Sequence, residues 1–171
     1  MLVGLTGKIK SGKSELAKVL INDGYLLYNF KQGLIDEIKT NFYELLDIIS
    51  KKTNKTVDEL FTIKPYEPEI RALLRNYGTD VRRKDNPDYW VNKWYTNLPK
   101  NKDIVVDDVR FLNEANIIKK QGGIIIRINR TGIDINDNHQ SEKEMDLIEE
   151  DYLIYNNATI EDLKNKIYKI I

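Results

Sequence analysis

The chain has 171 residues, of which 41% are hydrophobic, and this is enough for one sizeable core. Its 27 basic and 27 acidic residues cancel, so no overall field draws the protein to a nucleic-acid polymer or a membrane surface. The chain contains no cysteine, which excludes disulfides, thiolate metal sites and thiol catalysis and favours a reducing compartment, the cytoplasm. With no long apolar span or signal peptide, we expect a soluble single domain over residues 1–171.

The first predicted elements are a strand at residues 2–5 and a helix that begins near Glu15. The residues between them fit the P-loop pattern G-x-x-x-x-G-K-S/T. Glycines at both ends let backbone N–H groups face a phosphate, and the helix start and a lysine add positive charge. We therefore predict that a nucleoside triphosphate binds here, through Gly7, Lys8, Lys10, Ser11, Gly12, Lys13 and Ser14.

The region from residue 25 to residue 98 is predicted to be mainly helical. A strand at residues 25–30 precedes one long helix, whose apolar residues recur at spacings of three and four. They are Leu34, Ile38, Phe42, Leu45, Leu46 and Ile49. Three further helices are expected: a short one capped by Thr56, one from Pro68 to Gly78, and one after Pro87.

The last part of the chain alternates strands and helices. Strands are predicted at residues 104–106, 124–128 and 152–155, and helices at 114–120, near 142–149 and after Thr159. Residues 130–141 are polar and rich in turn formers. This alternation predicts a three-layer α/β/α fold, in which a mostly parallel five-stranded sheet lies between two layers of helices. Ligands are then expected beyond the carboxyl ends of the strands.

Two aspartates follow the strand at residues 104–106, where a carboxylate can reach a magnesium ion or its water shell. The Ser14 hydroxyl would complete the ligands that the protein supplies to the metal. The alternative is that either aspartate only caps a turn. The sequence leaves open which of Asp107 and Asp108 faces the metal.

Six arginines lie near the predicted ligand edge of the sheet, and the planar guanidinium group suits phosphate well. For each of them a solvated surface position is the alternative. They are Arg75, Arg82, Arg83, Arg110, Arg127 and Arg130.

Four segments, taken in order, resemble the bacteriophage deoxynucleoside monophosphate kinases of the P-loop kinase superfamily. They are Arg71–Arg83, Asp88–Val91, Asp108–Ala115 and His139–Glu142. The third segment, which reads D-V-R-F-x-N-E-A, is the most specific, although Leu112 stands where proline is common in that family. The resemblance runs from the P-loop to about Glu142.

The resemblance implies transfer of the γ-phosphoryl group of ATP, with Mg²⁺, to a deoxynucleoside 5′-monophosphate, a step of deoxynucleotide biosynthesis. It places the acceptor in a helical region at about residues 31–98 and a short lid at about 130–142. The implied catalytic residues are Lys13, Asp108 and Arg130. The implied acceptor-binding residues are Asp80, Arg82, Arg83, Trp90, Asp108, Arg110 and Glu142. Because Asp108 then serves the acceptor, Asp107 becomes the metal candidate beside Ser14.

Several alternatives stay open at this point. Trp90 is either a stacking platform for a base or part of the core. The protein could be another small-molecule P-loop kinase, of the phosphomevalonate or dephospho-coenzyme A kinase type, or a nucleotide-binding module without turnover. A GTP-operated switch is disfavoured, because the N-K-x-D pattern begun at Asn54 fails at Val57. Base preference and a homodimeric state are not determined.

Overall fold

The computed structural model describes residues 1–132 and 140–171, with the side chains of 140–142 left out. The chain divides into two compact units. Unit 1 consists of Met1–Phe30 and Asn97–Ile171, and unit 2 of Lys31–Thr96. The bounds of unit 2 nearly coincide with the helical region that the sequence analysis placed at about residues 31–98.

Unit 1 is built on a five-stranded sheet with the strand order β2-β3-β1-β4-β5. All four pairs of neighbouring strands are parallel, as expected for strands joined by helical crossovers. The strands are β1 (Leu2–Thr6), β2 (Leu26–Leu27), β3 (Ile104–Val106), β4 (Ile124–Asn129) and β5 (Tyr152–Tyr155). The predicted α/β class and five-stranded parallel sheet are confirmed.

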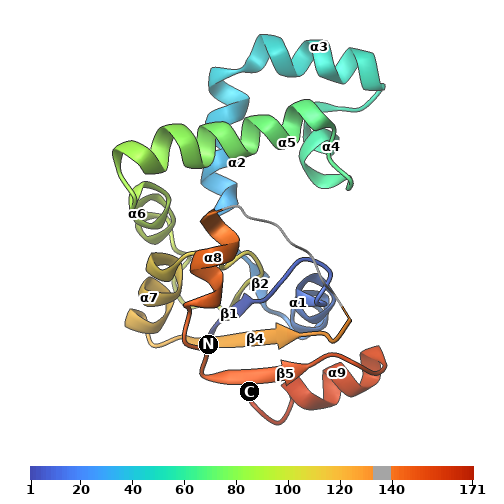
Figure 1. The fold of residues 1–171 in the computed structure, drawn as a ribbon, viewed down its shortest axis with the longest axis vertical. Coiled ribbons are helices and arrows are strands. Elements are labelled where there is room, and N and C mark those ends of the chain that lie inside the picture. Colours follow the sequence, from blue (N-terminus) through green and yellow to red (C-terminus); the bar gives the residue numbers. More distant parts are fainter. Residues whose placement is uncertain (133–139) are drawn as a thin grey trace. The chain divides into compact units, whose positions relative to one another are not determined.

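Helices cover both faces of this sheet (Figure 1). Side chains alternate between the faces along a strand, so Val3 and Leu5 of β1 join the cluster formed with α1 (Lys13–Asn22) and α9 (Ile160–Ile167). On the opposite face, a Cβ added to Gly4 would lie 2.9 Å from the side chain of Ile118 in α7 (Leu112–Lys120). The last helix of the unit, α8, spans Gln140–Asp146. The result is the predicted three-layer architecture.

The second strand is shorter than the predicted span of residues 25–30. Tyr28 still donates its N–H to the carbonyl of Val105 at 3.0 Å. The next two residues leave the strand ladder, because Asn29 and the N–H of Phe30 bond instead to the carboxylates that follow β3. The chain therefore exchanges strand hydrogen bonds for contacts with Asp107 and Asp108.

Unit 2 is entirely helical. Its helices are α2 (Lys31–Asn41), α3 (Tyr43–Thr53), α4 (Val57–Thr62), α5 (Pro68–Arg75), the π-helix η1 (Asn76–Arg83) and α6 (Tyr89–Thr96). The predicted capping box of Thr56 and Glu59 is present. Among the residues that the structure describes, no helix is long and apolar enough to cross a membrane.

Two predicted helix boundaries in unit 2 are wrong. The long helix over Leu34–Ile49 is broken at Phe42, whose backbone (φ −124°, ψ 30°) is not helical, and α3 turns away from α2 there (Figure 1). The break lets both helices place apolar residues in the same cluster and brings the Phe42 ring 5.3 Å from that of Tyr77. Gly78 does not end its helix, because η1 continues through it to Arg83.

The structure also separates two neighbouring leucines that the apolar stripe placed together in the core. Leu46 is 0% exposed, whereas Leu45 is 41% exposed. We expect Leu46→Ala to lower the free energy of unfolding by about 2–5 kcal/mol, since it leaves a cavity. Leu45→Ala should change that free energy by about 0.5 kcal/mol or less. Urea titration followed by circular dichroism measures both, and equal losses would contradict the burial of Leu46.

Candidate active site

The loop between β1 and α1 is held in a form that requires glycine at both ends. Gly7 has φ of 135°, and a Cβ on it would lie 2.2 Å from the carbonyl oxygen of Ile128 in β4. Gly12 has φ of 110°, and a Cβ on it would lie 2.2 Å from Nδ2 of Asn156. Any side chain at either position would meet both backbone strain and a close neighbour. The predicted phosphate loop therefore has the tight backbone that the motif needs.

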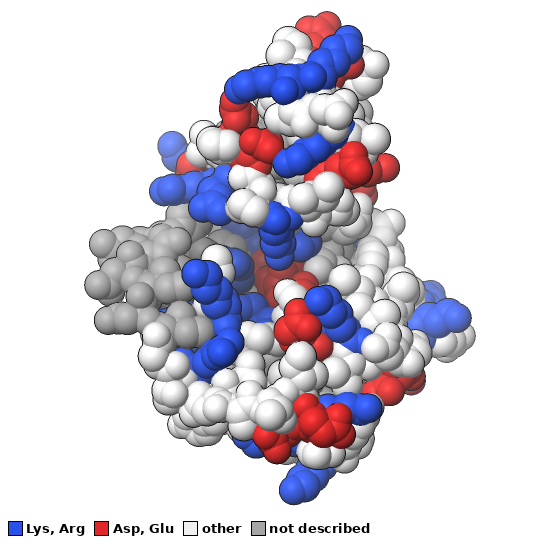
Figure 2. Space-filling view, turned by 90° about the vertical axis from the view of Figure 1, so that its right-hand side faces the viewer, with Lys and Arg blue, Asp and Glu red and all other residues white. Residues whose placement is uncertain are grey.

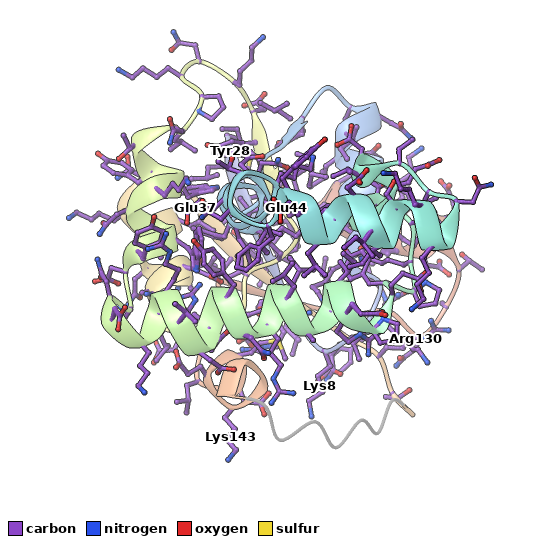
Figure 3. The ribbon with its side chains drawn as sticks, turned by 90° about the horizontal axis from the view of Figure 1, so that it is seen from above. Lys8, Tyr28, Glu37, Glu44, Arg130 and Lys143 are labelled. Atoms are coloured by element: carbon purple, nitrogen blue, oxygen red, sulfur yellow. The ribbon has the colours of Figure 1, made fainter. Side chains whose placement is uncertain are left out.

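Positive charge surrounds this loop. The ammonium group of Lys13 donates to the carbonyl of Gly7 and, at 2.8 Å, to that of Lys8. Lys8, Lys10 and Arg130 are exposed, and Figure 3 labels Lys8 and Arg130. Ser11 is buried. With the first turn of α1 directly after Gly12, the arrangement can bind a polyanion through backbone amides and cationic side chains.

Asp107 faces the loop. The hydroxyl of Ser14 donates to its Oδ2 at 3.1 Å, and the side-chain amide of Asn29 donates to its Oδ1 at 2.7 Å. Asn29 also accepts the Asp107 N–H at 2.9 Å. Each oxygen of the Asp107 carboxylate thus has a partner, and the backbone of Asp107 is held as well. The two residues predicted to serve the metal, Ser14 and Asp107, thus lie together.

Asp108 points elsewhere. Its Oδ1 accepts the N–H of Phe30 at 3.1 Å. Of the two aspartates, only Asp107 is seen bonded to Ser14 of the P-loop among the hydrogen bonds of the described residues. Arg110, two residues further on, is half-buried.

Glu114, in the most specific of the family segments, has a structural role. It is only 3% exposed, and its Oε2 accepts the N–H groups of Arg110 at 2.8 Å and of Phe111 at 3.2 Å. These bonds satisfy two amides at the start of α7 and fix the turn that carries Asp108 and Arg110.

Asn156 is a residue that sequence reasoning missed. It directly follows β5, and its Nδ2 donates to the carbonyl of Ser11 at 2.8 Å. Its own N–H donates to the carbonyl of Asn129 at 2.7 Å, which continues the bonding between β5 and β4. The available signal was its place at the carboxyl end of a strand, the edge where ligands bind. Asn156 therefore supports the P-loop backbone beside Gly12.

Arg127 makes three hydrogen bonds within unit 1. Its guanidinium donates to Glu150 at 2.8 Å and to the carbonyls of Met145 and Ile148 at 3.1 and 2.6 Å. The Arg127 hydrogen bond lowers the pKa of Glu150 below its usual value. This arginine links β4 to the end of α8 and to Glu150, a contact that favours a structural role.

The predicted acceptor residues of unit 2 fall into different environments. Arg82 bonds to Tyr77 and Glu37, whereas Arg83 donates to the carbonyl of Pro87 at 3.3 Å. Asp80 is exposed. Trp90 is 3% exposed and its indole N–H donates to the carbonyl of Gly78 at 2.9 Å, which favours core packing over a stacking platform.

Two expectations fall on parts that the structure does not describe. The side chain of Glu142 lies outside the described residues, as do residues 133–139 of the expected lid. Arg130, at the start of that segment, is described and exposed.

Charges of both signs alternate at the α3–α4 end of unit 2, in the upper part of Figure 2. Three ion pairs there join Lys51 to Asp47, Lys52 to Glu69 and Lys39 to Asp58, at 2.6, 2.9 and 2.6 Å. The positive charges of these three lysines are thus balanced by neighbouring carboxylates.

The contact of Asn156 with the P-loop is open to a direct test. Asn156→Ala removes the hydrogen bond to Ser11, so we expect calorimetry to show about three- to tenfold weaker binding of ATP, as the loss of one such bond predicts. Asn116→Ala, at an exposed position of α7, is the matched control. Equal affinities of the two variants would argue against a supporting role for Asn156.

Known proteins with a similar fold include dephospho-CoA kinase from Campylobacter jejuni. It matches with a TM-score of 0.52 and 18% identity, over 99% of this chain and 94% of that one. At this identity the similarity concerns the fold alone.

Two curated relatives are closer in sequence. A putative deoxynucleotide monophosphate kinase of Acanthamoeba polyphaga mimivirus is 33% identical and covers all of this chain and 96% of its own length. The deoxynucleotide monophosphate kinase of Escherichia phage RB69 is 31% identical over 64% of this chain, which spans 52% of that relative. A family profile described as deoxynucleotide monophosphate kinase matches residues 46–167. The chain therefore belongs to the deoxynucleotide monophosphate kinase family.

Proposed function

We propose that this protein transfers the γ-phosphoryl group of ATP to the 5′-phosphate of a deoxynucleoside monophosphate. The observation that carries the proposal is the P-loop, with Asp107 bonded to Ser14 beside it, in a chain of this kinase family. Relatives of viral origin and a chain without cysteine support a role in deoxynucleotide synthesis in the host cytoplasm.

The donor side of the reaction falls to the P-loop. Its amides and the start of α1 hold the β- and γ-phosphates, and the Lys13 ammonium moves from its loop carbonyls to the transferring group. The protein forms no covalent bond to the substrates in this scheme, because phosphoryl transfer depends mainly on positioning the reactants and neutralising the charge of the phosphates. Exposed Arg130 supplies a further cation for that charge.

The residues proposed to bind the acceptor are Asp108 and Arg110 within unit 1, and Arg82 and Arg83 within unit 2. Asp108 and Arg110 share the turn that Glu114 fixes, so their positions are set before substrate arrives. Guanidinium groups suit the acceptor phosphate because they offer several donors in one plane.

The residues present also fit a magnesium ion. Among the described residues no group of three or more His, Cys, Asp or Glu side chains could hold a metal. A P-loop site needs no such group, since a hydroxyl, a carboxylate, water and substrate phosphates complete the shell. Ser14 and Asp107 would hold the ion, which supplies neutralisation of phosphate charge.

Product analysis tests the proposed function. The purified protein is incubated with ATP, MgCl₂ and each of the four common deoxynucleoside monophosphates, and nucleotides are separated by anion-exchange chromatography. We expect a deoxynucleoside diphosphate from at least one of them. Dephospho-coenzyme A and phosphomevalonate complete the acceptor panel. Product from these acceptors alone, or none at all, would end the proposal.

Lys13 is expected to be essential. Lys13→Ala removes a cation aimed at the developing phosphate charge, so we expect kcat to fall about 10²- to 10³-fold. Lys18→Ala, on the same helix but exposed and paired with Glu15 at 2.8 Å, is the control and should keep nearly full activity. Similar rates for both variants would remove Lys13 from the mechanism.

The two aspartates should respond differently to magnesium. Asp107→Asn removes the negative charge beside Ser14, so we expect the Mg²⁺ concentration for half-maximal rate to rise about tenfold or more. Asp108→Asn should instead raise the KM for the monophosphate, with little change in the Mg²⁺ requirement. Titrations of Mg²⁺ at saturating ATP measure both, and the reverse pattern would assign the metal side to Asp108.

A further inference from the structure

Unit 2 contains a half-buried carboxylate that the sequence analysis did not single out. Glu37 projects from α2 and has only 13% of its side chain exposed (Figure 3). Its Oε1 accepts the Lys93 ammonium at 2.7 Å and the Tyr89 hydroxyl, and its Oε2 accepts the Tyr77 hydroxyl at 3.0 Å. The Arg82 guanidinium lies 3.1 Å from the same Oε2. Four donors from η1 and α6 thus converge on one carboxylate.

These bonds keep Glu37 ionised. Burial by itself raises the pKa of this carboxyl, but hydrogen bonds from Lys93, Tyr89 and Tyr77 outweigh it and hold the pKa below its usual value. The hydrogen bond to Glu37 in turn raises the pKa of the Tyr89 hydroxyl. Glu37 is therefore a fixed negative charge at neutral pH.

The cations are the more accessible members of the cluster. Arg82 and Lys93 bring two cations to the single carboxylate of Glu37. The side chains of Arg82 and Lys93 are 35% and 33% exposed, whereas Glu37 is 13% exposed. An anion that arrives from solvent therefore meets these two cations before it meets the carboxylate.

Arg82 is held in one orientation. Its Nε and Nη2 donate to the Tyr77 hydroxyl at 3.0 and 2.7 Å, and its guanidinium carbon lies 5.1 and 4.9 Å from the ring centres of Tyr77 and Tyr89. Among the described residues no atom bonds to its Nη1. One edge of the guanidinium is thus fixed by protein, and the other remains for a ligand.

The π-helix makes this arrangement possible. In an α-helix of 3.6 residues per turn, residues five apart point about 140° away from each other. In η1, with its i→i+5 bonds, Tyr77 and Arg82 face the same neighbour and bond to one another. Such wide turns are uncommon and occur frequently at functional sites.

We propose that Glu37 is a positioning residue that orients Arg82 and Lys93 as a two-cation site for the 5′-phosphate of the acceptor. The inference rests on the proposed function and adds Lys93 and Glu37 to the residues that serve the acceptor. Preorganised cations bind a phosphate more tightly, because the ligand does not have to order two long side chains.

Glu37→Gln tests the inference, because the amide keeps the shape of the side chain and removes its charge. We expect the KM for the monophosphate to rise about tenfold, as is typical when a supporting partner is lost, with kcat and the KM for ATP changed about twofold or less. Glu44→Gln is the matched control, since Glu44 is exposed on α3 of the same unit. An unchanged KM for the monophosphate, or an equal rise in both KM values, would overturn the inference.

Tyr77→Phe provides a second variant in case Glu37→Gln does not fold, which circular dichroism would reveal. It removes the hydroxyl that joins Arg82 to Glu37, so the KM for the monophosphate should again rise while the KM for ATP stays unchanged. An unchanged KM for the monophosphate in this variant would also contradict the inference.

Direct binding separates this inference from the proposed function. Calorimetry with each monophosphate, without ATP, should show weaker binding to Glu37→Gln than to the wild type. The corresponding deoxynucleosides, which lack the phosphate, should bind both proteins equally. If the wild type binds a monophosphate but forms no diphosphate, the proposed function fails while the positioning role is still tested by affinity. If the wild type binds no monophosphate, both fail.

Discussion

The contact between the P-loop and the ends of strands β4 and β5 is the constraint on which the donor site depends. Gly7 packs against the carbonyl of Ile128, and Asn156 bonds to the carbonyl of Ser11 beside Gly12. These contacts come from strands far along the chain, so the loop reaches its working shape only when the parallel sheet has formed. Tight packing at both glycines fixes the loop backbone before a nucleotide arrives, which reduces the ordering that binding requires. The shape of the P-loop therefore depends on contacts that only the folded sheet provides.

The carboxyl end of β3 extends this preorganisation. Asn29 bonds to Asp107 from both its amide nitrogen and its amide oxygen, while Glu114 caps the turn that carries Asp108 and Arg110. Neighbouring aspartates thus acquire different surroundings from different partners. One lies with Ser14 on the P-loop side, and the other bonds to the backbone of Phe30. Adjacent positions in the sequence can in this way have different partners and face different parts of unit 1.

In unit 2, too, side chains are held in place by their neighbours, here through ion pairs and hydrogen bonds to one carboxylate. Glu37 draws together two cations and two tyrosine hydroxyls from η1 and α6, and its carboxylate is less exposed than the side chains of Arg82 and Lys93. The irregular features of this unit lie around the cluster. The break at Phe42 brings a ring against Tyr77, and the π-helix places Arg82 beside Tyr77. Both departures from regular helix geometry thus contribute to the surroundings of one arginine.

The sequence by itself determined the phosphate loop, the succession of the five strands, and the family, because these depend on local periodicity and on residues at fixed short spacings. It identified Ser14 and the pair Asp107 and Asp108, but not which aspartate faces the loop. Only the tertiary structure decided that choice, the support from Asn156, and the roles of Glu37 and Arg127. The bond from Asn156 to Ser11 joins residues 145 positions apart, and the contacts of Glu37 join three helices. No short-range pattern records such partners, since the fold brings them together through packing rather than through spacing along the chain.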